Sequence, residues 1–227
     1  RTAMHCLDET CHGLREALAT LRRRINLLRG DSSRSWLGRK EYWDAAYASG
    51  RYKDSYEWNQ TCETIWPYVL NTLENRLDAK ILHVGCGNSR LGRMLHDDGY
   101  INVLNVDYSR VVIKMMQQSQ PELQFLCVDC AESGALGEAD HFDFCVDKGA
   151  IDSLFESNCD SMWQQGCAMI QEIHRVLKPG GKYLVISNGG IGSDVLKATF
   201  GHMQSEEIEG YACDLYYKLI TIIVCTK

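Results

Sequence analysis

Residues 80–89 read Lys-Ile-Leu-His-Val-Gly-Cys-Gly-Asn-Ser, and residues 103–107 read Val-Leu-Asn-Val-Asp. The first stretch is a short apolar run that meets a tight Gly85-Cys-Gly87 turn and leads into a helical pattern. The second is another apolar run, and it closes on Asp107, 20 residues after Gly87. A βαβ unit that binds a nucleotide has this layout, because glycines allow close backbone approach and an acid binds the ribose hydroxyls. The spacing therefore predicts such a unit.

Two departures from the common nucleotide motifs narrow the choice of ligand. Arg90 stands at the third glycine of the G-x-G-x-x-G dinucleotide fingerprint, where a large side chain fits poorly. No Gly-Lys-Ser/Thr follows, so the P-loop pattern is missing as well. The remaining Gly-x-Gly-Asn-Ser loop suits a nucleoside ligand without a pyrophosphate, and S-adenosylmethionine is the common ligand of that kind. We expect Asn88 or Ser89 to cap the helix that follows.

Strand-like and helix-like patterns alternate along most of the chain. Apolar runs predict strands at 80–84, 102–106, 123–128, 142–147 and 182–187, and helical spacing predicts helices at 61–77, 89–98, 109–118 and 160–177. This alternation is typical of a parallel sheet with helices on both faces. Segments 203–209 and 214–226 instead predict two strands around a Gly210–Cys213 turn, which gives an antiparallel closing hairpin. The expected fold is α/β, a Rossmann-like seven-strand sheet of the methyltransferase type.

Charge divides the chain into two parts. Residues 1–40 carry nine basic and four acidic side chains, a net +5, which leaves −11 for residues 41–227 because the whole chain has −6. So acidic a domain is a poor nucleic-acid binder and attracts a basic, lysine-bearing protein surface, although acidity that only keeps the domain dissolved explains the charge equally well. We expect a basic helical extension at 1–38, with its helix over 4–29, and one domain at 39–227.

Cysteine usage and hydropathy bear on the compartment. Eleven cysteines are scattered without a disulfide framework, and this pattern predicts reduced thiols in the cytoplasm. Cys127-Val-Asp-Cys130 has the spacing of half a zinc site, but no second pair completes four ligands, so no metal is expected. No apolar run approaches the roughly 18 residues of a membrane span. Because the chain opens at Arg1, a mitochondrial address stays open.

Five short motifs resemble, in the same order, those of one methyltransferase group. They are Glu41-Tyr-Trp-Asp-Ala-Ala-Tyr47, Tyr56-Glu-Trp58, His83-Val-Gly-Cys-Gly-Asn-Ser89, Asn105-Val-Asp-Tyr-Ser109 and Val146-Asp-Lys-Gly-Ala-Ile-Asp152. The group is the seven-strand protein-lysine methyltransferases of translation elongation factor 1A, with a mitochondrial relative that acts on citrate synthase. The resemblance covers residues 39–187, and Ala150 departs from the threonine usual at its position. It implies methyl transfer from S-adenosylmethionine to a lysine of a protein such as an elongation factor.

The expected cofactor site takes residues from the ends of the second and third strands. Asp107 is expected to accept hydrogen bonds from both ribose hydroxyls, and Tyr108 to lie against the adenine. The resemblance implies that Asp129 accepts a hydrogen bond from the adenine amino group and that the Cys130 amide meets a ring nitrogen. A simple turn residue at the strand end is the other interpretation of Asp129.

Aromatic and basic residues complete the expected site. The resemblance implies that Trp43, Tyr47 and Tyr56 fold over the cofactor, where an aromatic wall suits a sulfonium cation. Plain packing against the core is the alternative for these rings. Gly85 lets the backbone touch the methionine part, and the resemblance places Lys148 at the cofactor, although a surface lysine paired with a neighbouring aspartate would show the same pattern.

Catalysis leaves several readings open. Asp147 or Asp152, after the fourth strand, is a hypothetical group to orient the target amine or take its proton. A small-molecule methyltransferase and a cofactor-binding interaction module without turnover are the alternatives to a protein-lysine enzyme. Gly85, Gly87, Asp107 and Asp129 are all in place, which argues against loss of binding but not against loss of transfer. Polyamine synthesis is disfavoured, because no carboxylate pair that would grip a polyamine is evident.

Overall fold

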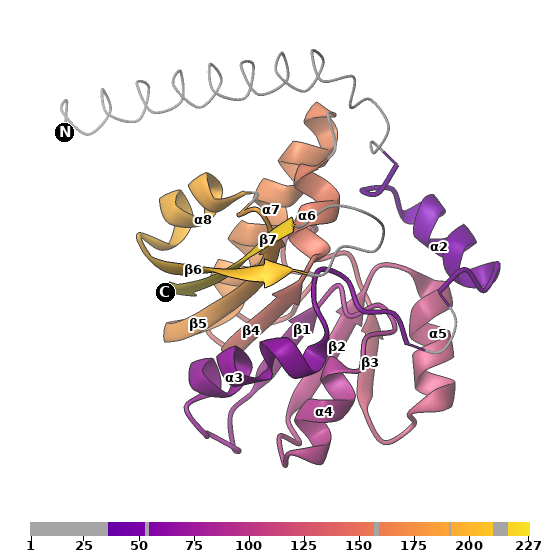
Figure 1. Cartoon of the computed structure of the whole chain (residues 1–227), viewed down its shortest axis with the longest axis horizontal. Coiled ribbons are helices and arrows are strands. Elements are labelled where there is room, and N and C mark those ends of the chain that lie inside the picture. Colours follow the sequence, from indigo (N-terminus) through magenta and orange to yellow (C-terminus); the bar gives the residue numbers. More distant parts are fainter. Residues whose placement is uncertain (1–35, 53–54, 157–158, 191, 211–217) are drawn as a thin grey trace.

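The computed structural model describes residues 36–52, 55–156, 159–190, 192–210 and 218–227 (Figure 1). Its strands are β1 Ile81–Val84, β2 Val103–Asp107, β3 Gln124–Cys127, β4 Phe142–Lys148, β5 Leu177–Asn188, β6 His202–Gly210 and β7 Lys218–Thr226. Its helices are α2 Lys40–Ala48, α3 Cys62–Leu73, α4 Leu91–Asp97, α5 Arg110–Ser119, α6 Ala150–Phe155, α7 Asp160–Val176 and α8 Ser193–Phe200. The helix predicted over 4–29 and residues 211–213 of the predicted turn lie outside the described residues.

The strands of the described chain form one sheet in the order β3-β2-β1-β4-β5-β7-β6. The five strands β1 to β5 are parallel, and β7 inserts antiparallel between β5 and β6. β6 ends at Gly210 and β7 begins at Lys218, a separation in sequence that is too short for the crossover that parallel neighbours need. The predicted fold, including the antiparallel hairpin, is therefore confirmed.

Successive side chains of the central strands point to opposite faces of the sheet, so the core is divided between two helical layers. Ile81 of β1 packs with α3 and α4 in one buried cluster, while Leu82 packs with α6, α7 and α8 in another. Figure 1 shows α3 and α4 on one side of the sheet and α7 and α8 on the other. The central strands β1 and β4 are buried along their whole length, as expected for a parallel sheet covered on both faces.

Two boundaries differ from the sequence expectation for local reasons. The helix predicted to reach residue 77 ends at Leu73, because Glu74 and Asn75 adopt left-handed backbone angles with φ of 53° and 56°. The strand predicted at 182–187 begins earlier, at Leu177, and its register against β4 shifts between Leu177 and Lys182. Gly180 and Gly181 exchange backbone hydrogen bonds with Lys227, so the C-terminal end of the described chain holds this irregular segment in the sheet.

Candidate active site

The crevice of an open α/β sheet lies where neighbouring strands send their connections to opposite faces. β1 leads to α4, whose Leu91 packs in the cluster with α3, and β4 leads to α6, whose Ile151 packs in the cluster with α7 and α8. β1 and β4 are adjacent in the sheet. The carboxyl ends of these two strands are therefore the topological switch point, where ligands bind in such folds.

The glycine loop follows β1 at this point. Gly85 and Gly87 have φ of +56° and +48°, a left-handed region that costs other residues energy. A Cβ atom at Gly87 would also lie 2.7 Å from the Tyr47 hydroxyl oxygen. The predicted cap at Asn88 or Ser89 is wrong, because the N-cap of α4 is Arg90, which makes no side-chain cap bond. The Ser89 hydroxyl still accepts the Leu91 amide hydrogen at 3.2 Å.

Asp107 ends β2 beside this loop. Its carboxylate accepts the backbone N–H groups of Gly87 at 3.0 Å and Ser109 at 2.8 Å. Burial raises the pKa of Asp107 from 3.8 to about 6, and these two hydrogen bonds offset only part of that effect. A buried acceptor at the end of β2 is the arrangement that the sequence predicted for a ribose site.

Tyr108, Asp129 and Cys130 form the next part of the site. The Tyr108 hydroxyl is one of the buried polar atoms of the described chain without a hydrogen-bond partner. Asp129 lies two residues past the end of β3, and its carboxylate accepts the Ala131 amide hydrogen at 2.9 Å. Cys130 is buried, with its thiol in the core below. An orphaned hydroxyl at a cavity wall is a group that a bound ligand would satisfy.

Aromatic rings gather on the other side of the loop. Trp43 and Tyr47 belong to α2, and Trp43 donates its indole N–H to the Leu37 carbonyl oxygen at 2.6 Å. The Trp43 ring stacks on Tyr47, with ring centroids 6.0 Å apart, and meets Trp58 edge-on at 5.5 Å. Tyr56 meets Trp58 at 5.0 Å, so the three predicted aromatics form one wall together with Trp58.

Lys148 pairs with a residue that the sequence analysis did not single out. Its ammonium lies 2.7 Å from the Glu57 carboxylate and donates to the Trp58 carbonyl oxygen at 2.9 Å. Only 2% of the Lys148 side chain and 16% of the Glu57 side chain are exposed. Burial acts to raise the pKa of Glu57. The charge of Lys148 and the hydrogen bonds from Lys148, the Arg90 amide and Ser89 outweigh burial and lower that pKa. The alternative interpretation, a surface lysine paired with Asp147 or Asp152, is wrong, because Lys148 is buried and pairs with Glu57.

Asp147 and Asp152 do not belong to the cavity wall. Asp147 accepts the Ala150 and Ile151 amide hydrogens at the start of α6 and the Tyr183 hydroxyl hydrogen at 2.9 Å. Burial, with the neighbouring charge of Asp152, raises the pKa of Asp147 to about 7. These contacts hold α6 on the end of β4, and they suit a structural role better than the proposed catalytic one.

Asp152 is likewise committed to neighbouring segments. Its carboxylate accepts hydrogen bonds from Ser187 at 2.6 Å, from the Asn188 amide at 2.8 Å and from the Asn59 side chain at 2.7 Å. Burial raises its pKa to about 6. The carboxylate therefore ties α6 to β5 and to the segment before α3.

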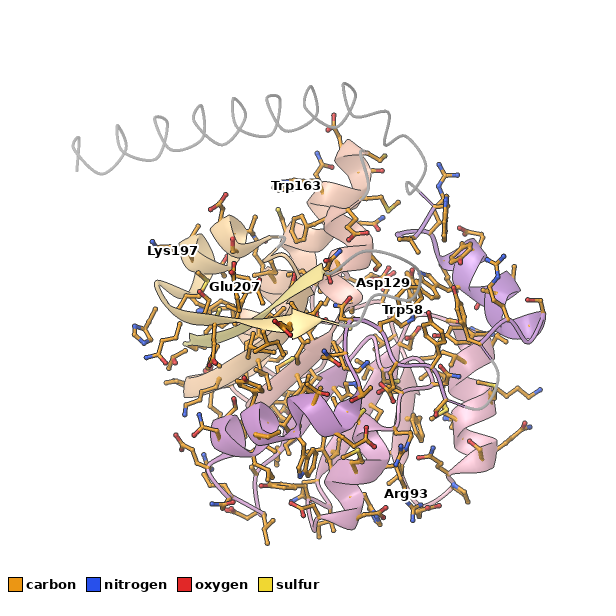
Figure 2. All side chains as sticks on the ribbon, viewed as in Figure 1. Trp58, Arg93, Asp129, Trp163, Lys197 and Glu207 are labelled. Atoms are coloured by element: carbon orange, nitrogen blue, oxygen red, sulfur yellow. The ribbon has the colours of Figure 1, made fainter. Side chains whose placement is uncertain are left out.

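One cavity of about 500 Å³ brings the predicted cofactor residues together. All ten line it: Trp43, Tyr47, Tyr56, Gly85, Gly87, Asp107, Tyr108, Asp129, Cys130 and Lys148. Figure 2 shows Trp58 and Asp129 at the same end of the sheet, and both belong to the lining. Glu57, Asn59, His83 and Glu156 also line the cavity and were missed, because no local pattern marks a residue whose partners are distant in sequence.

Comparisons with known proteins agree with this geometry. Residues 82–185 match the methyltransferase domain family. Over 190 residues the chain is 33% identical to the human eEF1A lysine and N-terminal methyltransferase, covering 80% of this chain and 25% of that protein. It is 30% identical over 157 residues to the mouse EEF1A lysine methyltransferase 4, covering 66% of this chain and 61% of that protein. The chain thus spans about a quarter of the length of the human relative.

A solved structure shows the same fold. The 1,6-didemethyltoxoflavin-N1-methyltransferase of Burkholderia thailandensis superposes with a TM-score of 0.58 at 15% identity, covering 83% of this chain and 87% of that one. Residues 82–185 therefore resemble a methyltransferase domain, in a sheet that has the fold of the solved methyltransferase. Within the residues that the structure describes, no helix has both the length and the apolar character to cross a bilayer.

Three observations show that the cavity suits S-adenosylmethionine. The Asp107 carboxylate is buried at the end of β2, where it would hold the ribose, and the unpartnered Tyr108 hydroxyl beside it needs a partner. The aromatic wall would face the sulfonium, which suits a cation. Finally, Gly85 and Gly87 line the cavity without side chains, so a ligand can approach the loop backbone closely.

Proposed function

We propose that this protein is an S-adenosylmethionine-dependent methyltransferase that transfers a methyl group to an amino group of a protein. A lysine side chain is the first choice of acceptor, and translation elongation factor 1A is the first target. One observation carries the proposal: the chain is 33% identical, over 80% of its length, to a protein named for lysine and N-terminal methylation of eEF1A. The same chain holds a cavity with the expected cofactor residues at its switch point.

The residues of the cavity support such a transfer by positioning. S-adenosylmethionine supplies a methyl group on a sulfonium, which a neutral amine attacks in line. Asp107 would hold the ribose, and the rings of Trp43, Tyr47 and Trp58 would exclude water from the reacting atoms. An in-line attack needs no covalent enzyme intermediate, so no nucleophile is required of this chain.

Charge supports a basic protein target. Residues 41–227 carry a net −11, from a chain total of −6 and +5 in residues 1–40. An acidic surface steers a lysine-rich protein toward the cavity and opposes the binding of nucleic acid. We therefore propose a basic protein partner and no nucleic-acid partner.

The test is methyl transfer from labelled S-adenosylmethionine to purified elongation factor 1A, followed by mass spectrometry of the modified peptides. Label on a lysine side chain supports the proposal. Label on the N-terminal amine, abolished when that amine is acetylated, moves the target to the second activity in the name of the human relative. Label found only in the small-molecule fraction of a cell extract favours a small-molecule substrate, and cofactor binding without any transfer favours an interaction module.

We place the activity in the cytoplasm, because the thiols suit a reducing compartment. Among the described residues, Cys62, Cys86, Cys127, Cys130, Cys145 and Cys225 are free thiols. Scattered free thiols are typical of proteins kept reduced inside the cell. Immunolocalisation of the full-length protein tests this placement, and co-localisation with a mitochondrial marker would contradict it.

A further inference from the structure

Residues 55–60 cross the carboxyl edge of the sheet between α2 and α3, and we call this segment the strap. It carries two rings of the cavity wall, Tyr56 and Trp58, in alternation with two polar residues, Glu57 and Asn59. The backbone of the strap has no regular helix or strand. Its position therefore depends on the side-chain bonds that it makes with the rest of the fold.

Glu57 fastens the strap to the glycine loop and to β4. Its carboxylate accepts the Ser89 hydroxyl hydrogen and the Arg90 amide hydrogen, both at 2.8 Å, at the start of α4. The same carboxylate pairs with Lys148 at 2.7 Å, and Lys148 in turn donates to the Trp58 carbonyl oxygen. Because the ammonium is almost fully buried, removal of either partner leaves an uncompensated charge.

Asn59 fastens the strap to α6 and β5. Its side-chain nitrogen donates to the Asp152 carboxylate at 2.7 Å and to the Ile186 carbonyl oxygen at 2.9 Å. Asn59 has φ of +64°, a left-handed conformation that asparagine tolerates and glycine adopts freely. The next residue, Gln60, donates to the Glu209 carbonyl oxygen of β6 at 2.9 Å, so the strap is attached across the C-terminal half of the sheet as well.

We infer that Glu57 and Asn59 are positioning residues, which hold Tyr56 and Trp58 against the bound cofactor and slow its departure. Lys148 and Asp152 then act through the strap and not on the reacting atoms. This inference rests on the proposed function only for the presence of the cofactor, not for the identity of the target. A cofactor covered by the strap leaves only when these bonds break, so weakening them raises its dissociation rate.

The decisive comparison is Asn59→Gly against Asn75→Gly. Both asparagines have left-handed backbones, with φ of 64° and 56°, so glycine relieves strain equally at the two sites. Asn75 is exposed after α3 and does not line the cavity, whereas Asn59 loses two hydrogen bonds. Stopped-flow displacement of S-adenosylhomocysteine should show dissociation about tenfold faster for Asn59→Gly, the size expected for two lost hydrogen bonds, and unchanged within about twofold for Asn75→Gly.

A double-mutant cycle on the buried pair gives a second measurement. Glu57→Gln and Lys148→Met should each speed dissociation, and the double variant should be no faster than the worse single variant, because both remove the same fastening. At saturating cofactor, kcat should fall less than the KM for S-adenosylmethionine rises, since the rings are displaced but the reacting groups are intact.

The inference fails if Asn59→Gly lowers the melting temperature while its dissociation rate equals that of the unmodified protein, because the residue is then only structural. It also fails if the Glu57→Gln and Lys148→Met effects on dissociation add. If the unmodified protein binds S-adenosylhomocysteine but does not methylate elongation factor 1A, the proposed target is wrong, and the dissociation rates still decide the role of the strap.

Discussion

At the scale of single residues, Asp107 links burial to cofactor affinity. Its folded pKa is about 6, and ribose hydroxyls donate to the ionised carboxylate. We expect the affinity for S-adenosylmethionine to fall as the pH drops from about 7.5 to 5, because protonation through a pKa of about 6 removes the acceptor charge. Isothermal titration calorimetry across this range measures it. Asp107→Asn should bind at least about tenfold more weakly at pH 7.5 and lose the pH dependence, as charged hydrogen bonds are the stronger kind; a variant with the same pH profile would contradict the assignment.

The sequence revealed cavity residues that stand in recognisable motifs and missed those defined by partners far along the chain. Asp107 was found because a carboxylate closes the second apolar run at a known spacing. Glu57 stands within the quoted Tyr56-Glu-Trp58 motif, but its partner Lys148 is in another motif, at the end of β4. No local pattern relates the two residues, since the fold alone brings a loop before α3 to the end of β4.

At the scale of elements, the glycine loop requires both an unusual backbone angle and open space. We expect Gly87→Ala to weaken S-adenosylmethionine binding at least about tenfold, because the new methyl group must displace the Tyr47 hydroxyl that lies 2.7 Å away. Gly134→Ala is the matched control: Gly134 has φ of +81° but nothing within 4 Å of the added carbon. Both variants should lose stability by about 1 kcal/mol from the left-handed backbone. Equal cofactor affinities in calorimetry would show that the Tyr47 contact is unimportant.

The sequence predicted helices and strands where apolar residues recur with a clear period. It did not predict element boundaries that tertiary contacts determine. The five parallel strands were located as short apolar runs, and the closing pair was located from the long apolar β7, since β6, with the sequence His-Met-Gln-Ser-Glu-Glu-Ile-Glu-Gly, is mostly polar. The helices α2, α6 and α8 were not predicted; α6 has only six residues, and its first turn is held by Asp147 rather than by a local cap. The early start of β5 depends on backbone hydrogen bonds between Gly180, Gly181 and Lys227, and Lys227 is too distant in sequence for a local pattern to reveal them.

At the scale of the whole molecule, β7 completes the core of one helical layer. Ile223 is fully buried there and pairs with Val185 of β5. Ile223→Ala should lower the free energy of unfolding by about 2–5 kcal/mol, from lost burial and the cavity left behind. Ile101→Ala makes the same chemical change at a side chain that is 67% exposed, and it should cost less than about 0.5 kcal/mol. Urea denaturation measures both, and similar losses would contradict the assigned burial of β7.

The buried carboxylate of Asp147 makes the stability of the whole fold depend on pH. Its pKa is 3.8 in the unfolded chain and about 7 in the folded one, so between these values the folded state holds a proton that the unfolded state has released. The free energy of unfolding contributed by Asp147 therefore falls as the pH rises from about 4 to 7, by at most about 1.4 kcal/mol per pH unit. The difference in unfolding free energy between the unmodified protein and Asp147→Asn cancels the contributions of the histidines and the other carboxylates. Because the Asp147 contribution falls with rising pH, the variant should gain stability relative to the unmodified protein over this range.

Asp143→Asn is the control, because it removes the same charge from another buried aspartate with the opposite shift. Burial acts to raise the pKa of Asp143, but bonds from Lys178, the Lys80 amide and Arg76 outweigh it and lower the pKa below 3.8. Its ionised form therefore stabilises the fold at all pH values above about 4. The loss of unfolding free energy caused by Asp143→Asn should then be constant from pH 5 to 8, because Asp143 is ionised in both the folded and the unfolded state over that range. Urea denaturation at several pH values tests both variants. Parallel pH profiles for the two would show that Asp147 is ionised in the folded protein throughout, and that its three hydrogen-bond donors, not protonation, offset its burial.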